Sequence, residues 1–391
     1  MASKTVNVLK KNAMLIVLVL VYIFFTIMTG GSMFQAMNFN ALITQNAYVF
    51  ILATGMLMCM LTGGNIDLSC GSFVCFLGAV GGVLMTVKQF GAGVSIGIML
   101  LIGVIYGCVL GFLIAYVNIP PWIATLAGYL AFRGLGTAIL SANSTTGSIS
   151  LSNEETYLAL FSGKLFSTPV GQLNLICLIV GIVASVLLVV LVFSTRARKL
   201  KKGYEADSLM AVILKSVLGV AAIMLFAYKL ALSGGIPTVL VWVVAIVLLY
   251  SFITSKTTTG RYFYTIGDNA EATRLSGIDT RKIMFLAYLN MAVLTAVTTF
   301  IVSARFQAAN STAGTYFEMD AIAACVVGGV SAYGGSGKIT GMVVGATLIG
   351  VINLGMSLMG VNADWQKIVK GLVLLGAVVF DILAAKKNST K

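Results

Sequence analysis

Residues 173–194 read LNLICLIVGIVASVLLVVLVFS, and this run decides the fold class of the chain. It contains no charged side chain, and it is about as long as the 20 or so apolar residues that a helix needs to cross a bilayer. A bilayer core admits only helices and closed barrels, because every backbone polar group must be paired there. The apolar runs of this chain are continuous rather than short and alternating, which favours helices.

The composition of the whole chain agrees with this interpretation. Of its 391 residues, 59% are hydrophobic and 9% are charged, whereas soluble domains carry about 25% charged residues. A chain of this length cannot hide so much apolar surface from water, so we expect a polytopic membrane protein of the all-α class. The longest interval without an apolar run lies near 141–172, so residues 1–391 are predicted to form a single transmembrane domain.

The apolar runs predict about 10–12 transmembrane helices. The tenth run is short and rich in glycine, and we expect it to be at most a half-span. The runs lie near 12–30, 41–62, 71–87, 93–116, 121–140, 173–194, 210–230, 236–254, 283–304, 318–333, 338–360 and 364–385.

The basic residues predict the orientation of these helices, because cytoplasmic loops of membrane proteins carry an excess of Lys and Arg. With an even number of spans, both termini and the segment 255–282 are cytoplasmic, and the loop 141–172 is external. The net charge of +13 therefore reports orientation, and we expect no nucleic-acid partner. The cations on the predicted inner side are Lys4, Lys10, Lys11, Arg196, Arg198, Lys199, Lys201, Lys202, Lys256, Arg261, Arg274, Arg281, Lys282, Lys386, Lys387 and Lys391.

Catalytic and metal-binding signals are missing from the sequence. There is no histidine, and none of the six cysteines forms a C-x-x-C pair, so we expect no metal site and buried, reduced thiols. No G-x-x-x-x-G-K-[ST] phosphate-binding loop occurs. We therefore expect a transport subunit rather than an enzyme, with no cofactor of its own and with any ATP used by a partner.

A polar connection joins the second and third apolar runs, TGGNIDLSCGS at 62–72. Its glycines permit a tight chain reversal, and Asp67 or Ser69 can cap the helix that follows. The alternative is a broken segment that faces a translocation cavity, as unwound segments do in transporters. Asn65, Asp67 and Ser69 are then candidate pathway residues.

Two further charges lie inside apolar runs. Arg133 is a candidate pathway residue, because an arginine at membrane depth costs at least about 2.5–3.5 kcal/mol unless it is paired or hydrated. We expect it to face the bundle interior, either paired with a carboxylate or in contact with solute. Asp320 is expected to cap the start of its helix.

Residues 264–278 form the longest polar interval on the predicted inner side. Asparagine is favoured at helix starts, and Asn269 can cap a short helix whose first turn contains Glu271, a favourable place for a negative charge. Gly277 can end that helix in a left-handed conformation, and Gly267 is expected to play a similar part before it. The candidate coupling residues are Gly267, Asn269, Glu271, Ala272, Arg274, Leu275, Gly277 and Ile278.

With these segments in view, the chain resembles the permease subunits of ribose-, xylose- and galactose-type sugar ABC importers over nearly its whole length. It is most similar to the longer xylose and multiple-sugar permeases, because it carries about two extra spans and a basic loop around 195–254. The matching segments are GNIDLS at 64–69, GS at 71–72, PWIATL at 121–126, FRG at 132–134, G-x-N-x-x-A at 267–272, LSGI at 275–278, EMDAIAA at 318–324, VGG at 327–329 and WQKIVKG at 365–371.

The resemblance implies a permease of the cell (inner) membrane, most simply a homodimer, that translocates a monosaccharide of the xylose, arabinose, galactose, glucose or ribose class. It implies an external sugar-binding protein and an ATP-binding cassette subunit that docks on residues 267–278. A permease for a nucleoside or another small solute remains an alternative, as does an ion-coupled secondary transporter.

Overall fold

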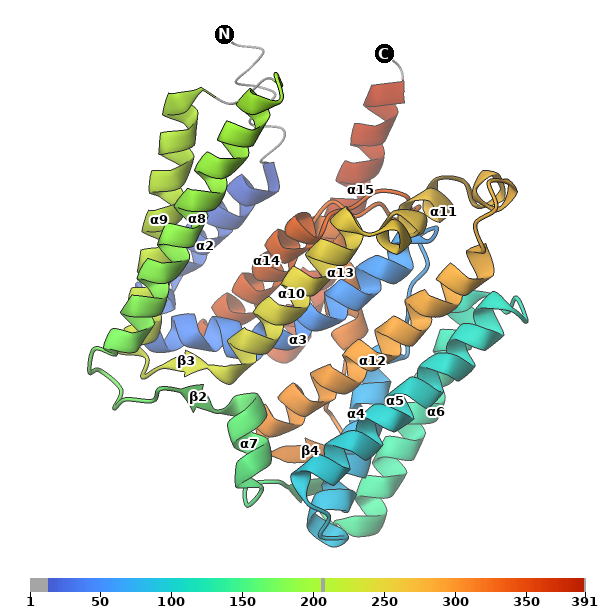
Figure 1. The fold of residues 1–391 in the computed structure, drawn as a ribbon. Helices are drawn as coiled ribbons and strands as arrows, with labels where there is room; N and C mark the ends of the chain where they lie inside the picture. Colours follow the sequence, from blue (N-terminus) through green and yellow to red (C-terminus); the bar gives the residue numbers. More distant parts are fainter. Residues whose placement is uncertain (1–12, 205–207, 390–391) are drawn as a thin grey trace.

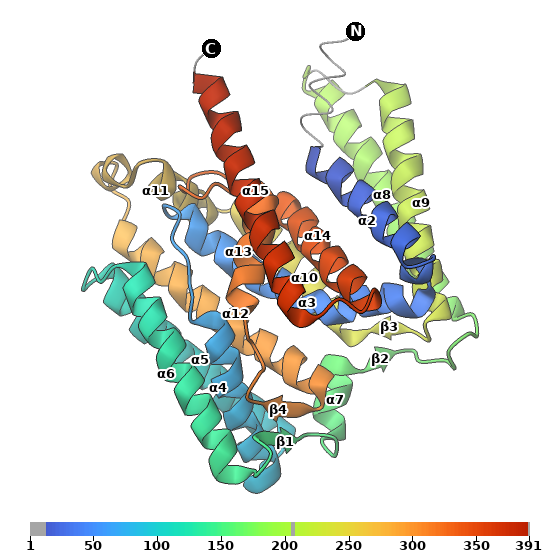
Figure 2. The same cartoon turned by 180° about the vertical axis from the view of Figure 1, so that it is seen from behind.

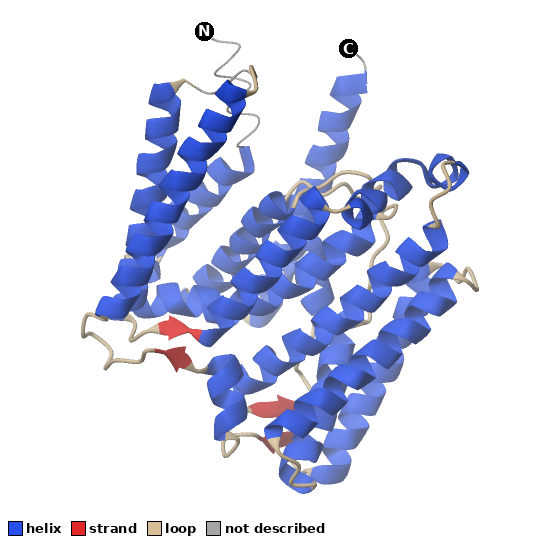
Figure 3. Cartoon of the chain, in the orientation of Figure 1, coloured by secondary structure: helices blue, strands red, loops and turns tan. Residues whose placement is uncertain are grey.

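The computed structural model describes residues 13–204 and 208–389, and for residues 380–389 the backbone alone. The fold is mostly helical, with four short strands that the sequence did not predict (Figures 1 and 3). The helices are α2 (Ala13–Met28), η1 (Ser32–Phe34), α3 (Ala36–Leu61), α4 (Cys70–Gly82), η2 (Val83–Val87), α5 (Ala92–Ala115), α6 (Pro121–Asn143), α7 (Glu155–Ser162), α8 (Leu175–Lys201), α9 (Leu209–Leu232), α10 (Thr238–Lys256), α11 (Thr258–Leu275), α12 (Thr280–Phe306), α13 (Phe317–Val327), α14 (Ile339–Leu358) and α15 (Ala363–Ser389).

Within the described part of the chain, nine helical segments are long and apolar enough to cross a membrane. This confirms a polytopic membrane protein. Helices occur at all of the predicted spans, and the expected half-span is α13, which has only 11 residues. The first predicted span, α2, has 16 residues and is shorter than the nine.

Helices α3 and α12 form the centre of the bundle. Helix α12 packs against α4 and α5, α3 packs against α13 and α14, and α3 and α12 also pack against each other (Figure 2). The second half of α3, from Ala47 to Leu61, is almost entirely buried, as is most of α12. Other helices surround α3 on all sides there, which identifies it as a core helix rather than a lipid-facing one.

Two of the spans are broken in the middle of the bundle. After α3 ends, residues 62–69 run back into the bundle without helical structure before α4 begins. After α12 and the strand β4 (Ala308–Asn310), residues 311–316 turn into the bundle from the opposite side before α13 begins. Helices α4 and α13 therefore run away from each other, starting from a common region in the interior.

The four strands form two antiparallel ribbons. Strand β1 (Ser148–Ser150) pairs with β4, and β2 (Lys164–Leu165) pairs with β3 (Ile236–Pro237). The molecule thus has a ribbon side and, opposite to it, an α11 side. The first residues of α2 and the last residues of α15 also lie on the α11 side (Figure 1), which agrees with an even number of crossings.

One part of the loop 141–172, the helix α7, packs on the bundle. This helix packs against α10 and α12, and Tyr157 and Phe161 are buried there. The Tyr157 hydroxyl lies 2.8 Å from Ser303 Oγ, and the Phe161 ring stacks on Trp242 with centroids 5.6 Å apart. Tyr157 and Phe161 therefore anchor α7 to the bundle. We call α7 and these two contacts the α7 lid.

Helices α8 and α9 form a hairpin at the edge of the molecule, next to α2 (Figure 1). They pack mainly on each other, and α9 also contacts α3. Only 17% of the most apolar window of α8 and 11% of that of α9 is buried. The end of α8, the loop after it and α9 fall within the insertion that the sequence predicts around 195–254, whereas most of α8 precedes it.

Three glycines spaced four residues apart, Gly103, Gly107 and Gly111, form a stripe along α5 that packs inside the subunit. A Cβ on Gly103 would lie 3.0 Å from the Ala296 side chain, and one on Gly107 would lie 2.9 Å from the Leu289 backbone. Gly111 faces the α12 backbone in the same way, and a Cβ there would lie 2.8 Å from a carbonyl oxygen. The stripe lets α5 and α12 approach closely.

Candidate functional site

The predicted coupling helix is present, with the cap that the sequence indicated. Asn269 has non-helical backbone angles (φ −160°, ψ 101°), so α11 consists of two helical pieces that meet at a kink. The Asn269 side-chain oxygen accepts a hydrogen bond from the Ala272 amide at 2.9 Å. Gly277 has a φ of 83° and follows the end of the helix, as expected for a left-handed terminator.

The helical piece before the kink, from Thr258 to Asp268, was missed by the sequence analysis, which placed a helix only after Asn269. Thr273 joins the two pieces, because its hydroxyl lies 2.8 Å from the Thr265 carbonyl before the kink and 2.8 Å from the Asn269 carbonyl at the kink, and shares its one proton between them. Thr273 itself is buried. The coupling segment is thus one bent unit rather than a single short helix.

The tip of this unit is exposed. Arg274 forms an ion pair with Glu271 at 2.6 Å, and both side chains are well exposed. The Arg274 guanidinium holds the pKa of the Glu271 carboxyl below its ordinary value. Leu275 is 77% exposed, and Ala272 is exposed beside it. An exposed leucine flanked by a fixed ion pair is a surface on which a partner can dock.

Gly267 does not have the left-handed conformation that we expected. Its backbone is helical, and its role is close approach instead. A Cβ at Gly267 would collide with the Leu61 carbonyl oxygen and with the Gly335 amide nitrogen. The need for glycine here comes from packing between segments that are far apart in the chain.

Gly267 belongs to a junction where three segments meet through their backbones. The Gly335 amide donates to the Leu61 carbonyl at 3.1 Å. A Cβ on Gly64 would collide with the Ala332 carbonyl oxygen. We call Gly64, Gly267 and Gly335, with the segments around them, the glycine junction.

The glycine junction connects the coupling unit to both broken spans. Residues 62–69 lead from it to α4, and the loop 328–338 follows α13. The Tyr264 hydroxyl adds a bond to the Gly337 carbonyl at 3.1 Å. The loop 328–338 is not among the predicted site segments, although its five glycines in eleven residues are a visible signal for backbone contact.

Asp67 and Ser69 lie together in a buried polar network. Asp67 Oδ1 accepts from the Ser69 amide at 2.8 Å and from the Ser69 hydroxyl at 2.6 Å. The Tyr106 hydroxyl of α5 donates to Ser69 Oγ at 2.7 Å. Asp67 therefore orders the turn before α4, whereas the N-cap residue of α4, Ser69, makes no side-chain cap bond. Neither Asp67 nor Ser69 is exposed in this conformation.

Asn65 lies in the same connection, and its side chain stabilises the turn that follows α3. Its side-chain amide donates to the Thr62 carbonyl at 3.0 Å and to the Thr62 hydroxyl at 3.2 Å. It is only partly buried. Of the predicted pathway residues, the structure thus brings Asn65, Asp67 and Ser69 into one segment.

Arg133 is separate from that segment, and its hydrogen-bond partners are backbone carbonyls. Its Nη1 donates to the carbonyls of Ser311 and Ala313, at 3.1 and 2.9 Å. These carbonyls belong to the broken part of the span that leads to α13. Arg133, which lies on α6, therefore stabilises one of the broken spans. The unwound backbone there has carbonyl oxygens without helical hydrogen bonds, and the guanidinium donates to them.

The two broken spans touch where α4 and α13 begin. Cβ atoms on Gly71 and Gly314 would each collide with the carbonyl of the other residue. Glu318, in the first turn of α13, is buried, and its Oε2 has no hydrogen-bond partner. The positive ends of two helix dipoles point into this region, which favours a carboxylate there. Such crossings of half-helices are where transporters bind their substrates.

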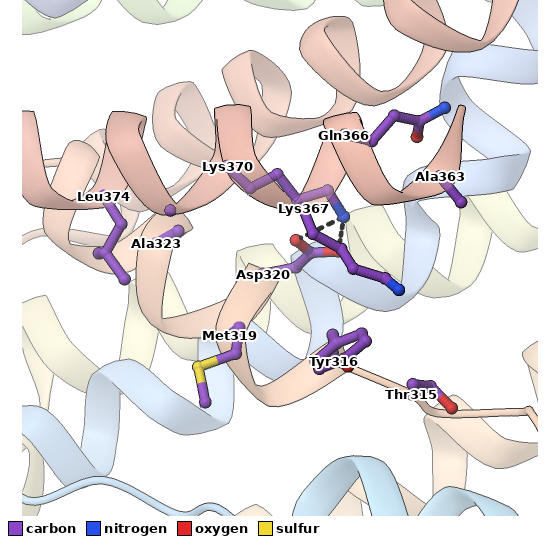
Figure 4. A pocket seen from close by; sticks show the side chains of 11 residues that line it. Thr315, Tyr316, Met319, Asp320, Ala323, Ala363, Gln366, Lys367, Lys370 and Leu374 are labelled. Atoms are coloured by element: carbon purple, nitrogen blue, oxygen red, sulfur yellow. Dashed lines mark hydrogen bonds and ion pairs between the residues drawn. The ribbon is translucent and has the colours of Figure 1, made fainter. Parts of the chain in front are cut away.

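Asp320 does not cap α13 as we expected. Its carboxylate lies 2.9 Å from Lys370 Nζ of α15, and it accepts a 2.6 Å bond from the Tyr48 hydroxyl. The pair borders a cavity of about 410 Å³ between α13 and α15 (Figure 4). Tyr316 and Gln366 line the same cavity. Both charges are visible in the sequence, but no local pattern indicates that they meet.

The cysteines are buried thiols, as expected. All six are free, and all but Cys108 are buried, so they pack as small apolar groups. No cluster of three or more His, Cys, Asp or Glu that could hold a metal ion occurs among the described residues.

Residues 38–378 match the family described as "Branched-chain amino acid transport system / permease component". The chain belongs to this family. It is therefore a multi-pass permease subunit of the inner membrane and has no ATPase of its own.

Several curated permeases are similar to this permease over nearly their whole length. The xylose transport system permease protein XylH of Haemophilus influenzae is 34% identical over 385 residues, which is 98% of this chain and 99% of that protein. XylH of Escherichia coli K12 is 32% identical and covers 99% of this chain and 94% of its own. The ribose import permease protein RbsC of Escherichia coli K12 is 30% identical over 374 residues, which is 95% of this chain and 94% of that protein. No solved structure matches the chain.

Proposed function

We propose that this permease imports a pentose, in the class of xylose or ribose, as part of a binding-protein-dependent complex. The observation that carries this proposal is the similarity to xylose transport permeases over 98% of the chain. ATP hydrolysis is supplied by a separate ATP-binding cassette subunit, and the sugar is delivered by an extracytoplasmic binding protein.

The ATP-binding subunit docks on the α11 side. The exposed tip of the coupling unit, with Leu275 at its apex and the Glu271–Arg274 pair beside it, has the form of a helix end that inserts into a groove. An excess of basic residues in this part of the chain supports a cytoplasmic α11 side, with both termini on the same side. These basic residues are Lys256, Arg261, Arg281 and Lys282.

The ribbon side then faces the binding protein, and two permease subunits form the translocation unit. The α7 lid and the two ribbons supply an ordered outer surface, because Tyr157 and Phe161 fasten the lid to the bundle. The four predicted pathway residues support the pathway by holding the two broken spans in place, rather than by lining an open channel in this conformation. They are Asn65, Asp67, Ser69 and Arg133.

Reconstitution tests the proposed function directly. In vesicles that contain the permease, its ATP-binding subunit and its binding protein, we expect xylose uptake only when ATP is present on the α11 side. Vesicles with the permease alone serve as the control and should take up no sugar. Sugar uptake by the permease alone, driven by an ion gradient, would contradict the proposal.

The orientation and the docking site are tested separately. A cysteine at Ser152 should react with an impermeant thiol reagent from outside, and a cysteine at Lys201 should not. Gly277→Val requires a β-branched residue to adopt a positive φ, a strain of about 1–3 kcal/mol, while a Cβ there meets no neighbour. We expect the variant to insert normally and to co-purify poorly with the ATP-binding subunit. Full co-purification would show that the tip is only a connector.

A further inference from the structure

The cavity between α13 and α15 combines buried charge with open space. It measures about 410 Å³, within the range of small-molecule sites. One end is polar, with Asp320, Lys370 and Gln366, and the other is apolar, with Met319 and Leu374 (Figure 4). It borders the first turns of α13, close to where the two broken spans cross.

The acidic member of the ion pair is fixed. The Asp320 side chain is 3% exposed, and the Tyr48 hydroxyl of α3 donates to its Oδ2 at 2.6 Å. The Tyr48 ring in turn stacks on Phe317, with centroids 3.7 Å apart. Two elements therefore hold this carboxylate in one position at the wall of the cavity.

The basic member is held less tightly. The Lys370 side chain is 25% exposed, and its ammonium contacts both Asp320 oxygens, at 2.9 and 3.0 Å. A lysine has a long flexible stem and three donors. It can turn from the carboxylate toward a hydroxyl group in the cavity while Asp320 stays in place. Charges at membrane depth are costly and usually mark a substrate path.

The side chains around this pair fit a sugar. A carboxylate accepts hydrogen bonds from hydroxyl groups, an ammonium donates to them, and the Gln366 amide can do both. Tyr316 presents an exposed ring at the polar end, which can cover the less polar face of a sugar ring. The cavity is too small for a chain of several sugars and large enough for one.

We propose that this cavity binds the translocated monosaccharide, with Asp320 as the fixed acceptor and Lys370 as the movable donor. The inference rests on the proposed import function and names the site within it. Binding breaks one Lys370–Asp320 contact and replaces it with bonds to the sugar hydroxyls. The polar groups thus remain satisfied whether the cavity is empty or occupied.

Two glycines of α15 allow a matched steric test. Gly371 lines the cavity and Gly376 does not, and a Cβ at either position would meet no atom within 4 Å. In the reconstituted complex, Gly371→Leu fills the cavity, so we expect at least a tenfold decrease in sugar imported per ATP hydrolysed. Gly376→Leu adds the same side chain to the same helix and should keep the wild-type ratio.

A labelling experiment gives an independent measurement on the purified permease. Gly371→Cys and Gly376→Cys are made in a background without the native cysteines, and alkylation by a maleimide is timed. Saturating xylose should slow the labelling of Gly371→Cys at least threefold. Gly376→Cys should be unaffected by xylose.

The outcomes separate the two proposals. If the wild-type complex imports xylose but Gly371→Leu keeps its import ratio and xylose gives no protection, the cavity is not the sugar site, although the import function stands. If lipid occupies it instead, alkylation slows with added phospholipid and not with xylose, which also overturns the assignment. If the wild-type complex imports no sugar, the function itself fails.

Discussion

The glycine junction and the α8–α9 hairpin both depend on glycines, but the neighbours of those glycines differ. In the junction, a Cβ on Gly267 would collide with the backbone of two distant segments. In the hairpin, a Cβ on Gly219 would lie 2.8 Å from the end of the Leu188 side chain, which can rotate away. A side chain can rotate away from an added methyl group, but the backbone of Leu61 or Gly335 can move only together with the segment to which it belongs.

The two regions also differ in what they connect. The junction joins the coupling unit to both broken spans, so we expect a displacement of α11 to move residues 62–69 and 328–338 with it. The hairpin contacts mainly itself and presents its apolar surface outward. A substitution of similar size should therefore affect transport strongly in the glycine junction and weakly in the α8–α9 hairpin.

Gly267→Ala should have the largest effect. The added methyl group cannot be accommodated without separating α11 from Leu61 and Gly335, and overpacking of this kind costs about 1–3 kcal/mol or more. We expect a lower thermal unfolding midpoint of the purified permease and loss of ATP-driven import. Gly219→Ala is the control and should lower neither. Wild-type import by Gly267→Ala would show that the junction is not tightly coupled to transport.

Thr273→Ala should have a smaller effect within the same region. It removes a hydroxyl whose single proton is shared between the Thr265 and Asn269 carbonyls, of which Thr265 lies across the kink; a hydrogen bond contributes about 0.5–1.5 kcal/mol. We expect the complex to form but the binding-protein-stimulated ATPase rate to fall several-fold. Thr273→Ser keeps the hydroxyl and should retain most of the rate, and equal losses in both variants would argue against the hydrogen bonds.

Gly181→Val tests the hairpin with a substitution as severe locally as the one in the junction. A Cβ at Gly181 would lie 2.5 Å from the Ala227 Cβ, so the hairpin should loosen and the unfolding midpoint should fall. Import per folded molecule should nevertheless stay within about twofold of the wild type, because the hairpin contacts neither broken span closely. A complete loss of import in Gly181→Val would show that the hairpin is as important for transport as the glycine junction.

Arg274→Gln should have the smallest effect on the permease itself. The Glu271 pKa is lowered by Arg274, so the pair can add stability only above the unfolded pKa of Glu271 and loses it as the pH falls through the folded one. Because both groups are exposed, we expect the unfolding midpoint of the variant to match the wild type from pH 7 to about pH 4. Binding of the ATP-binding subunit, measured at low and high salt, should weaken and lose part of its salt dependence.

The coupling segment shows how far local sequence goes. The Asn269 cap and the Gly277 terminator were predicted correctly, because capping depends on side chains within a few residues of the helix end. The expected role of Gly267 was wrong, because its constraint comes from Leu61 and Gly335, which are distant in sequence. Asp320 was misassigned for the same reason, since its partner on α15 lies 50 positions away.

The sequence alone was enough to predict a polytopic helical membrane protein and a helix capped at Asn269 and ended at Gly277, because hydrophobic length and local capping are properties of short stretches of chain. Only the tertiary structure decided which spans break, where their half-helices cross, and how the glycine junction ties them to α11. It also brought Asp320 and Lys370 to one cavity. These features depend on backbone approach and charge pairing between distant segments, which no local pattern of residues encodes.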